Sequence, residues 1–337
     1  MKSNKRYSLD IVIPCFNEAG GLANTITLVM SCVQSLLSDP EIRLKTFRLI
    51  LVDDGSRDQT WALIAAASAR DQRICGIRLS RNFGHQSALI AGLENVDADA
   101  CISMDADLQH DVGAIRAMLL AFQDGADLAL GVRENRQTDT LFKRGTAYAF
   151  YASLRLLGVG IVANHADYRL MSRRALDGLL AHKEVNLFLR GLIPSLGFNV
   201  ILVPYTCKSR AAGGTKYTLR KMIGLALNGA TSFSMRPLRL IGLLGLLVCA
   251  ISAVSILYVL VIRFAYPERA IAGWASTVLP IFALGGVQIL SIGVLGEYIG
   301  KIYMEVKRRP RYLIQDSTER GGADKKDDQR NHPDIRS

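Results

Sequence analysis

Residues 9–18 read LDIVIPCFNE, an aliphatic and β-branched run that stops at a proline and turns polar at Asn17 and Glu18. The same order returns in RLILVDDGS at 48–56 and in ACISMDAD at 100–107. Short apolar runs that end in turn-forming residues are typical of buried strands. Stretches with helical spacing of apolar residues lie between these runs. The alternation predicts an α/β fold around a mostly parallel sheet.

The pattern assigns the elements of this domain as follows. Strands are expected at Leu9–Pro14, Arg48–Asp53, Ile74–Leu79, Ala100–Asp105, Leu128–Val132 and Val200–Val203. Helices are expected at Leu22–Leu37, Thr60–Ala69, Gln86–Leu93 and Val112–Phe122. Because ligands of open α/β sheets bind outside the carboxyl ends of the strands, we expect the functional site at that edge.

Composition narrows the class of protein. The chain has 337 residues, 41 Lys and Arg against 30 Asp and Glu, and a net charge of +11. Half of the residues are hydrophobic and the mean hydropathy is +0.19, which excludes a disordered chain, a collagen and a disulfide-stapled mini-protein. A basic but apolar chain is typical of a nucleic-acid binder or a membrane protein. Its six cysteines show no CxxC spacing, so neither a metal cluster nor a redox pair is indicated.

Two long uncharged stretches favour the membrane over nucleic acid. They lie at about 240–262 and 272–296, and each is long enough for a helix to cross a bilayer, which takes about 20 residues. Two buried core helices are the alternative interpretation. Residues 216–236 have the pattern of an amphipathic helix at the membrane surface, although a helix packed on a core would show the same pattern.

These features divide the chain into four parts. We expect a catalytic domain at 1–215, the interfacial helix at 216–236, two spans within 237–300, and a basic segment with a disordered tail at 301–337. Basic residues are dense on both outer flanks of the spans, and such flanks stay cytoplasmic. The expected protein is a multi-pass protein of the inner (plasma) membrane with its catalytic domain and both termini in the cytoplasm.

The sequence MDADLQH provides candidate metal ligands. Asp105, Asp107 and Gln109 offer the hard oxygen atoms that Mg²⁺ or Mn²⁺ prefers. The alternative is an acid-rich loop stabilised by the dipole of the following helix. The neighbouring His110 is a candidate outer-shell group or a solvated side chain, and His85 is a candidate donor contact or an ordinary loop histidine.

Taken together, VIPCFNE, VDDGSRD, RNFGHQSAL and MDADLQH, with GEYIGKIY at 296–303, resemble the polyprenyl-phosphate glycosyltransferases of inverting glycosyltransferase family two. The likeness covers Leu9 to about Gln315, and ADYRLM at 166–171 is most similar to the bactoprenol glucosyl transferase branch, with the dolichol-phosphate mannose synthases as relatives. The resemblance implies a GT-A (Rossmann-like) catalytic domain. It also implies a nucleotide-sugar donor, a polyprenyl phosphate acceptor and a divalent metal.

The resemblance also implies roles for individual residues. It assigns the nucleotide-sugar to Pro14, Phe16, Glu18, Asp53 and Arg133. It assigns the acceptor and diphosphate to Arg144, Arg210 and Lys216. It assigns the metal to Asp105, Asp107 and Gln109, and catalysis to Asp167 and Asp107. The loop at 213–217 departs from the family by carrying Gly214 where a glutamate is usual, which puts any donor contact of that acid in doubt.

The expected reaction is transfer of a hexose, with glucose from UDP-glucose as the best candidate, to undecaprenyl or another polyprenyl phosphate. The product would be a lipid-linked sugar donor for modifying a cell-envelope glycan such as lipopolysaccharide. UDP-galactose, UDP-N-acetylhexosamine and GDP-mannose remain open as donors, as does a homo-oligomer. A non-catalytic membrane scaffold that binds nucleotide-sugar is the alternative from another class.

The role of Asp167 has two interpretations. It is either a base or a group that stabilises developing positive charge. The second interpretation is open because a phosphate acceptor needs little deprotonation.

Overall fold

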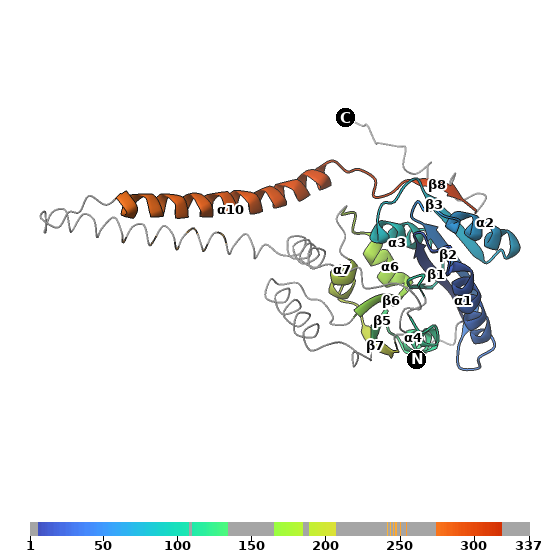
Figure 1. The fold of residues 1–337 in the computed structure, drawn as a ribbon. Helices are drawn as coiled ribbons and strands as arrows, with labels where there is room; N and C mark the ends of the chain where they lie inside the picture. The colour runs from blue at the N-terminus through green and yellow to red at the C-terminus, as the bar shows by residue number, and fades with distance from the viewer. Residues whose placement is uncertain are drawn as a thin grey trace, which may run out of the picture. The chain divides into compact units, whose positions relative to one another are not determined.

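The computed structural model describes five stretches of the chain, residues 6–107, 110–133, 165–184, 189–206 and 274–318, with a few single positions between 241 and 254 (Figure 1). The chain divides into two compact units. The first comprises Met1–Arg144, Ile161–Lys216 and Pro310–Ser337, and the second comprises Gly145–Gly160 and Tyr217–Arg309.

The first unit is built on an eight-stranded sheet in the order β7-β5-β6-β4-β1-β2-β3-β8. Its strands are β1 (Tyr7–Cys15), β2 (Leu44–Asp53), β3 (Ile74–Leu79), β4 (Ala100–Ser103), β5 (Leu128–Arg133), β6 (His165–Ser172), β7 (Val200–Tyr205) and β8 (Ile314–Ser317). The pairs β1–β2, β1–β4 and β2–β3 are parallel, whereas β6 is antiparallel to β4 and to β5. The carboxyl ends of β1 to β4 therefore meet at one edge.

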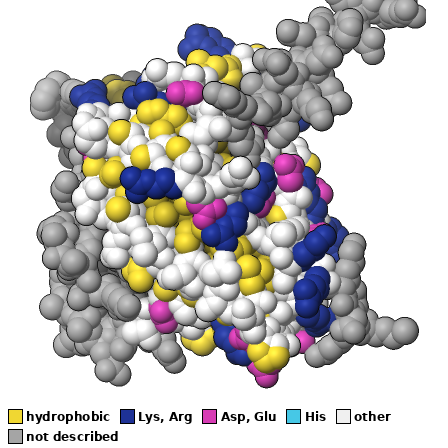
Figure 2. All heavy atoms as spheres, turned by 90° about the vertical axis from the view of Figure 1, so that its right-hand side faces the viewer, with side chains coloured by type: hydrophobic (Ala, Val, Ile, Leu, Met, Phe, Trp, Pro, Cys, Tyr) yellow, Lys and Arg dark blue, Asp and Glu magenta, His cyan; other side chains and the backbone are white. Residues whose placement is uncertain are grey.

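Helices cover the sheet, most of them through one apolar face, whereas α3 is buried over six consecutive residues. α1 (Leu22–Leu36) buries Leu22, Val29 and Val33, which share one face of a helix, and the Thr25 hydroxyl donates to the Ala106 carbonyl at 2.8 Å. The other described helices of this unit are α2 (Thr60–Arg70), α3 (His85–Leu93), α4 (Ala114–Gln123), α6 (Arg173–Leu180) and α7 (Leu189–Ser195). On the face drawn in Figure 2, basic and acidic side chains lie side by side with apolar ones between them.

Most expected elements are present with slightly different ends. Ile74–Leu79 is a strand over the expected range, and β4 ends two residues earlier than expected, at Ser103. Strands β6 and β8 and helices α6 and α7 were not expected. Because β8 includes residues 314–317, the C-terminal tail is still part of the sheet where disorder was expected, and residues 319–337 lie outside the described part.

The second unit contributes one described helix, α10 (Trp274–Val306), of 33 residues with Pro280 inside it. Across the described residues, no helix combines the length and apolarity that a membrane crossing demands. The second expected span, at about 272–296, overlaps α10. The first expected span and the helix expected at 216–236 lie outside the described residues, apart from single positions between 241 and 254.

A buried acid joins β5 to β6 and predicts how stability depends on pH. Asp127 accepts hydrogen bonds from the Ser172 hydroxyl at 3.0 Å and from Arg174 Nη2 at 2.5 Å. Burial raises the pKa of this carboxyl, but the bonds and charge of Arg174 and the bond from Ser172 outweigh that effect and hold it below its ordinary value. A lowered pKa stabilises the folded state above the unfolded pKa, about 3.9, and that contribution is lost as the pH falls through the folded pKa.

Asp127→Asn is therefore expected to lower the free energy of unfolding at pH 7. The difference between the variant and the wild type should stay constant down to about pH 5 and shrink below about pH 4. Urea unfolding followed by circular dichroism across this range measures it. A difference that stays unchanged down to about pH 3 would contradict the ionic role of Asp127.

Candidate functional site

Loops at the carboxyl ends of β1 and β2 are joined through Asn17. Its backbone N–H donates to the Ser56 hydroxyl and its side-chain oxygen accepts from the Arg57 backbone N–H, both at 2.9 Å. The φ of Asn17 is 54°, in the left-handed region that asparagine adopts more readily than most residues with a side chain. The sequence PCFNE thus ends its strand in a turn that is fixed by the next strand's loop.

Asp54 fixes the loop that follows β3. Its two carboxylate oxygens accept from the backbone N–H groups of Phe83 at 2.7 Å and Gly84 at 3.0 Å. Burial raises the pKa of Asp54 above its ordinary value, and these two hydrogen bonds offset only part of that shift. Because α3 begins at His85, directly after Gly84, Asp54 also fixes the backbone that carries His85.

Gly55 allows the loop after β3 to approach the loop after β2 closely. A Cβ atom at this position would lie 2.4 Å from the backbone carbon of Arg81 and 2.7 Å from the backbone nitrogen of Asn82, and the φ of Gly55 is +65°. Neither contact can relax by a side-chain rotation, because both atoms belong to the backbone. The DGS sequence is therefore required here for close packing as well as for its turn.

Gly55→Ala is expected to lower the free energy of unfolding by about 2 kcal/mol or more, from left-handed strain together with the backbone clash. Urea unfolding measures this change. Gly20→Ala is the matched control, because no atom lies within 4 Å of a Cβ there and its φ is not positive. Equal stability of the two variants would show that the loop after β3 moves without cost.

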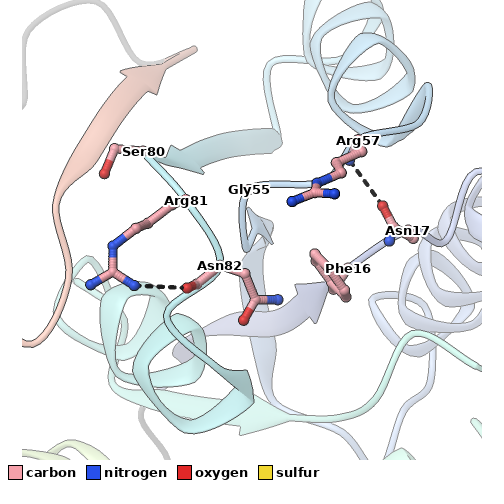
Figure 3. A pocket seen from close by; sticks show the side chains of 7 residues that line it. All are labelled: Phe16, Asn17, Gly55, Arg57, Ser80, Arg81 and Asn82. Carbon is pink, nitrogen blue, oxygen red and sulfur yellow. Dashed lines mark hydrogen bonds between the residues drawn. The ribbon is translucent and has the colours of Figure 1, made fainter.

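These loops surround a cavity of about 360 Å³, whose lining residues are Phe16, Asn17, Gly55, Arg57, Ser80, Arg81 and Asn82 (Figure 3). The Phe16 ring is 42% exposed, so one apolar surface is available for stacking. Arg57 and Arg81 come from the loops after β2 and β3. An exposed aromatic ring beside two guanidinium groups suits a flat ring that carries an anionic group.

Asp53 lies below this surface and does not line the cavity. Its side chain is fully buried, and Oδ1 accepts from the Ser56 backbone N–H at 3.0 Å. Oδ2 lies 3.6 Å from Arg78 Nε, and within the described residues neither of these two atoms has a hydrogen-bond partner. In this structure Asp53 therefore supports the loop after β2.

A second group of side chains comes together at the ends of β4 and β6. His85 Nε2 lies 3.5 Å from Asp105 Oδ1 and 3.9 Å from Asp167 Oδ2. The pairing of Ser103 with Arg169 explains this meeting. In an antiparallel pair, two residues forward from Ser103 lie opposite two residues back from Arg169, so that Asp105 faces Asp167. One ligand atom from each of His85, Asp105 and Asp167 lies within 4.8 Å of the others.

His110 fixes the orientation of the Asp105 carboxylate. Its ring is buried, with Nε2 at 3.0 Å from Asp105 Oδ2 and Nδ1 at 2.9 Å from the Tyr205 hydroxyl. Burial alone would raise the pKa of Asp105, but the hydrogen bond from His110 and the charge of His85 outweigh burial, so that the pKa is lowered. Asp105 Oδ2 is thus held by His110, and Oδ1 is directed toward His85.

Arg169 orients Asp167 in the same way. Its fully buried guanidinium donates from Nη2 to Asp167 Oδ1 at 2.5 Å and from Nε to the Ser103 hydroxyl at 3.3 Å. The same hydroxyl donates to the Asp167 backbone carbonyl at 3.2 Å. Oδ1 is held by Arg169, and Oδ2 is the oxygen nearer to His85.

The cluster of His85, Asp105 and Asp167, called the acidic cluster below, has the chemistry of a divalent cation site. Two carboxylate oxygens and one imidazole nitrogen face one another, while the second oxygen of each carboxylate is held by His110 or Arg169. Such outer contacts are typical of metal ligands, because they fix the direction in which the first oxygen points. The two carboxylates suit Mg²⁺ or Mn²⁺, and the imidazole nitrogen is a ligand that transition metals also accept.

The sequence-predicted residues are only partly brought together. Asp105 and Asp167 meet in the acidic cluster, and Phe16 lines the cavity. Asp107 lies two residues after Asp105 in the loop before α4. Pro14 lies within β1, and the Glu18 carbonyl accepts from the first backbone N–H of α1 at 3.0 Å. The described residues do not include Gln109, Arg144, Arg210, Lys216 or the side chain of Arg133.

Three contributors were missing from the sequence-based site. His85 appeared only as a candidate donor contact, although it faces both carboxylates. The sequence does not point to Tyr205, because it ends β7, a strand far along the chain from Asp105. Arg169 lies in the motif ADYRLM, and an arginine two residues after a candidate catalytic acid and directly before two apolar residues is the signal in the sequence.

Comparison with known proteins is consistent with this arrangement. Residues 10–180 match the family described as "Glycosyl transferase family 2". The chain is 45% identical over 91% of its length to the uncharacterized glycosyltransferase YkoT of Bacillus subtilis, of which 90% is covered. It is 37% identical over 91% of its length to the bactoprenol glucosyl transferase of Shigella phage SfX, of which 98% is covered.

Among solved structures, the mannosyltransferase PcManGT from Pyrobaculum calidifontis, in complex with GDP-Man and Mn²⁺, is similar over 67% of this chain and 64% of its own. The sequence identity is 15% and the TM-score 0.47. The family match runs from within β1 to the end of α6 and includes the cavity-lining residues and the acidic cluster. On that match and on the near full-length relatives, the chain belongs to glycosyl transferase family 2 and is a glycosyltransferase with a GT-A, Rossmann-like α/β fold.

Proposed function

We propose that this enzyme transfers a hexose, with glucose from UDP-glucose as the leading candidate, to a polyprenyl phosphate such as undecaprenyl phosphate. The observation that carries the proposal is the acidic cluster, which joins the residue after β4 to β6, together with a cavity suited to a nucleotide after β1, β2 and β3. The choice of acceptor and sugar is supported by relatives named bactoprenol glucosyl transferase, which match almost their whole length. The product would be a lipid-linked sugar for modification of a cell-envelope glycan.

The cavity is proposed as the site of the nucleotide. Phe16 offers an exposed ring on which a base can stack, and Arg57 and Arg81 offer forked donors to ribose or phosphate oxygens. The lining contains no acidic side chain, which favours an anionic ligand. GDP-mannose, UDP-galactose and UDP-N-acetylhexosamine remain candidates, because stacking on an aromatic ring does not by itself select a base.

The acidic cluster is proposed to hold Mg²⁺ or Mn²⁺ with Asp105, Asp167 and His85 as ligands. This set shares Asp105 with the set inferred from the sequence, to which Asp107 and Gln109 also belong. A bound divalent ion would neutralise charge on the donor diphosphate. His110 and Arg169 keep the two carboxylates aimed at one another, and Asp105 stays ionised because its pKa is lowered.

The proposed reaction is a single displacement with inversion. The acceptor phosphate is already largely dianionic at neutral pH, so its oxygen can attack the anomeric carbon without a base. The bond from that carbon to the nucleotide diphosphate breaks, and the diphosphate leaves with the electron pair. Asp167 is ion-paired with Arg169, which suits a carboxylate that orients the sugar or stabilises positive charge on it.

The acceptor side is proposed to lie at the inner (plasma) membrane, with the catalytic domain in the cytoplasm. A polyprenyl chain is confined to the bilayer, so its phosphate lies at headgroup level. The uncharged run at 240–262 supports an anchor. The large apolar side chains that α10 exposes, among them Ile289 and Ile292, support contact with lipid. Arg144, Arg210 and Lys216 remain proposed phosphate contacts on the strength of the family resemblance.

A panel of labelled nucleotide-sugars tests this function. The full-length protein in detergent is incubated with undecaprenyl phosphate, Mn²⁺ and each donor in turn, and the lipid-linked sugar is quantified. Transfer from UDP-glucose is expected, and excess EDTA should abolish it until Mg²⁺ or Mn²⁺ is restored. Full turnover in excess chelator would contradict the metal site, and no transfer from any donor would contradict the lipid acceptor.

A further inference from the structure

The C-terminal segment Arg311–Thr318 docks on the outer edge of the sheet, beside β3. Within it, β8 pairs antiparallel with β3, with Ser317 opposite Ile77 and Ile314 opposite Leu79. The register shifts between Arg78 and Leu79, so that Gln315 is the extra residue of a bulge. Bulges redirect a strand and are frequent beside active sites. The bulge lies at the end of β3, directly before Ser80, Arg81 and Asn82. These three residues line one side of the cavity and are called the cavity wall below.

The pairing continues past the end of β3 into that wall. The Ser80 backbone N–H donates to the Leu313 carbonyl at 2.9 Å. Ser80 is the first of three consecutive cavity-lining residues, followed by Arg81 and Asn82. Figure 3 shows Ser80 beside the pale red strand, with Arg81 and Asn82 following it along the loop. The C-terminal segment is therefore bonded to the cavity wall, although no residue of the segment lines the cavity.

Further contacts anchor both ends of the C-terminal segment. At its end, Thr318 donates its backbone N–H to the Gly76 carbonyl at 2.9 Å, and its hydroxyl oxygen accepts from the Gly76 N–H and the Ser68 hydroxyl, both at 2.8 Å. At its beginning, Arg311 Nη2 donates to the His182 carbonyl at 2.5 Å. The Tyr312 hydroxyl also donates to the Glu94 carboxylate.

Gly76 shows how closely the segment is fitted. A Cβ atom on this glycine would lie 2.5 Å from Ile64 Cγ2, 3.1 Å from Thr318 Cγ2 and 3.2 Å from Trp61. The absence of a side chain on β3 therefore allows Thr318 to lie against the strand while α2 packs nearby. Such close packing indicates that this position of the C-terminal segment is specific.

The cavity wall is held from two sides. Asp54 and Gly55 hold it from the loop after β2, through the hydrogen bonds to Phe83 and Gly84 and the close backbone approach described above. The C-terminal segment holds it from the sheet edge, at Ser80. Without the segment, the wall would lose its hydrogen bond at Ser80, and residues 80–82 would have more conformations available.

We propose that the C-terminal segment positions residues 80–82 for the donor nucleotide, so that docking of the segment and nucleotide binding stabilise each other. This inference rests on the proposed function, in which the cavity holds the nucleotide. Coupling of this kind is reciprocal: if docking strengthens binding, binding strengthens docking by the same factor. The segment follows α10 in the chain, since α10 ends at Val306 and β8 begins at Ile314.

Thr318→Val tests the coupling, because it removes the hydroxyl oxygen that holds Gly76 and Ser68 while nearly keeping the side-chain volume. We expect the dissociation constant of UDP, measured calorimetrically with Mn²⁺, to rise at least about fivefold. The KM for the nucleotide-sugar should rise in parallel, with little change in kcat. Thr318→Ser, which keeps the oxygen, should bind UDP as the wild type does.

Gln315→Ala is the matched control on the same segment, because Gln315 is the exposed bulge residue and should leave UDP affinity unchanged. Unchanged affinity in Thr318→Val would overturn the coupling. A fall in kcat and thermal stability at constant KM would overturn it too, because that pattern indicates a purely structural role. A wild type that binds neither UDP nor GDP would overturn the proposed function itself.

Hydrogen exchange in the wild type gives a test that needs no variant. UDP with Mn²⁺ should slow exchange of the Ser80 and Gly76 amides, which bond to the C-terminal segment. Amides of α4, whose residues neither line the cavity nor hydrogen-bond to the segment, serve as the internal reference. Exchange at Ser80 and Gly76 that is unaffected by bound UDP would overturn the proposal even if Thr318→Val fails to fold.

Discussion

Asp105→Asn is expected to lower the transfer rate by about two to three orders of magnitude while the protein stays folded. Asparagine keeps the shape of the side chain and an oxygen that can accept from His110 at the position of Oδ2. It removes the negative charge that faces His85 and Asp167. A neutral amide is a weaker ligand for a divalent cation, so binding of Mn²⁺, measured by electron paramagnetic resonance, should fall together with turnover.

Asp97→Asn is the control for this variant. It also removes one carboxylate, but the Asp97 side chain is 86% exposed and its ion pair with Arg48 is long, at 3.7 Å. Its turnover and Mn²⁺ affinity should match those of the wild type. If Asp105→Asn retains wild-type Mn²⁺ affinity and loses only turnover, Asp105 is not a metal ligand. If both survive, the acidic cluster is not the active site.

Asp167→Asn should lose transfer by at least about 100-fold and also lose stability. Removal of the carboxylate takes from the fully buried Arg169 the anion that pairs with it at 2.5 Å. Breaking a buried ion pair by removing one partner typically costs about 3 kcal/mol or more. Thermal unfolding measures the stability, and labelled lipid product measures the transfer.

Asp127→Asn separates the two effects of Asp167→Asn. Asp127 also pairs with an arginine at 2.5 Å, but Arg174 is 72% exposed and can be solvated when the carboxylate is lost. The variant should therefore be destabilised less than Asp167→Asn and should keep its transfer rate. Loss of transfer in both variants would show that activity follows stability alone and that Asp167 has no role in the reaction.

The sequence predicts the parallel core because side-chain pattern determines it. β1 to β4 are mostly apolar and largely buried runs, each followed closely by Asp or Asn, and these are the features on which a pattern search depends. The same reasoning locates Asp105 and the PCFNE and DDGS loops at the sheet edge. The strand ends that carry chemistry are thus recognisable without any knowledge of tertiary contacts.

The sequence pattern does not predict those parts of the structure that depend on contacts between distant residues. β6 carries a fully buried arginine, and the sequence around Arg169 therefore does not read as a core strand. β8 reads IQDS with all four residues exposed, so only its backbone pairing with β3 makes it a strand. His85 joins the acidic cluster because Asp54 fixes the backbone before α3, a contact between distant residues that no local pattern reveals.

The anomeric configuration of the lipid product tests the central proposal most directly. Purified full-length protein is incubated with UDP-α-glucose, Mn²⁺ and undecaprenyl phosphate, and the product is analysed by NMR spectroscopy. A single displacement at the acidic cluster predicts a β-linked glucosyl phosphate, formed in equal amount to the UDP released and absent with Asp105→Asn. An α-linked product, or a β-linked product formed equally well by Asp105→Asn, would contradict the proposal.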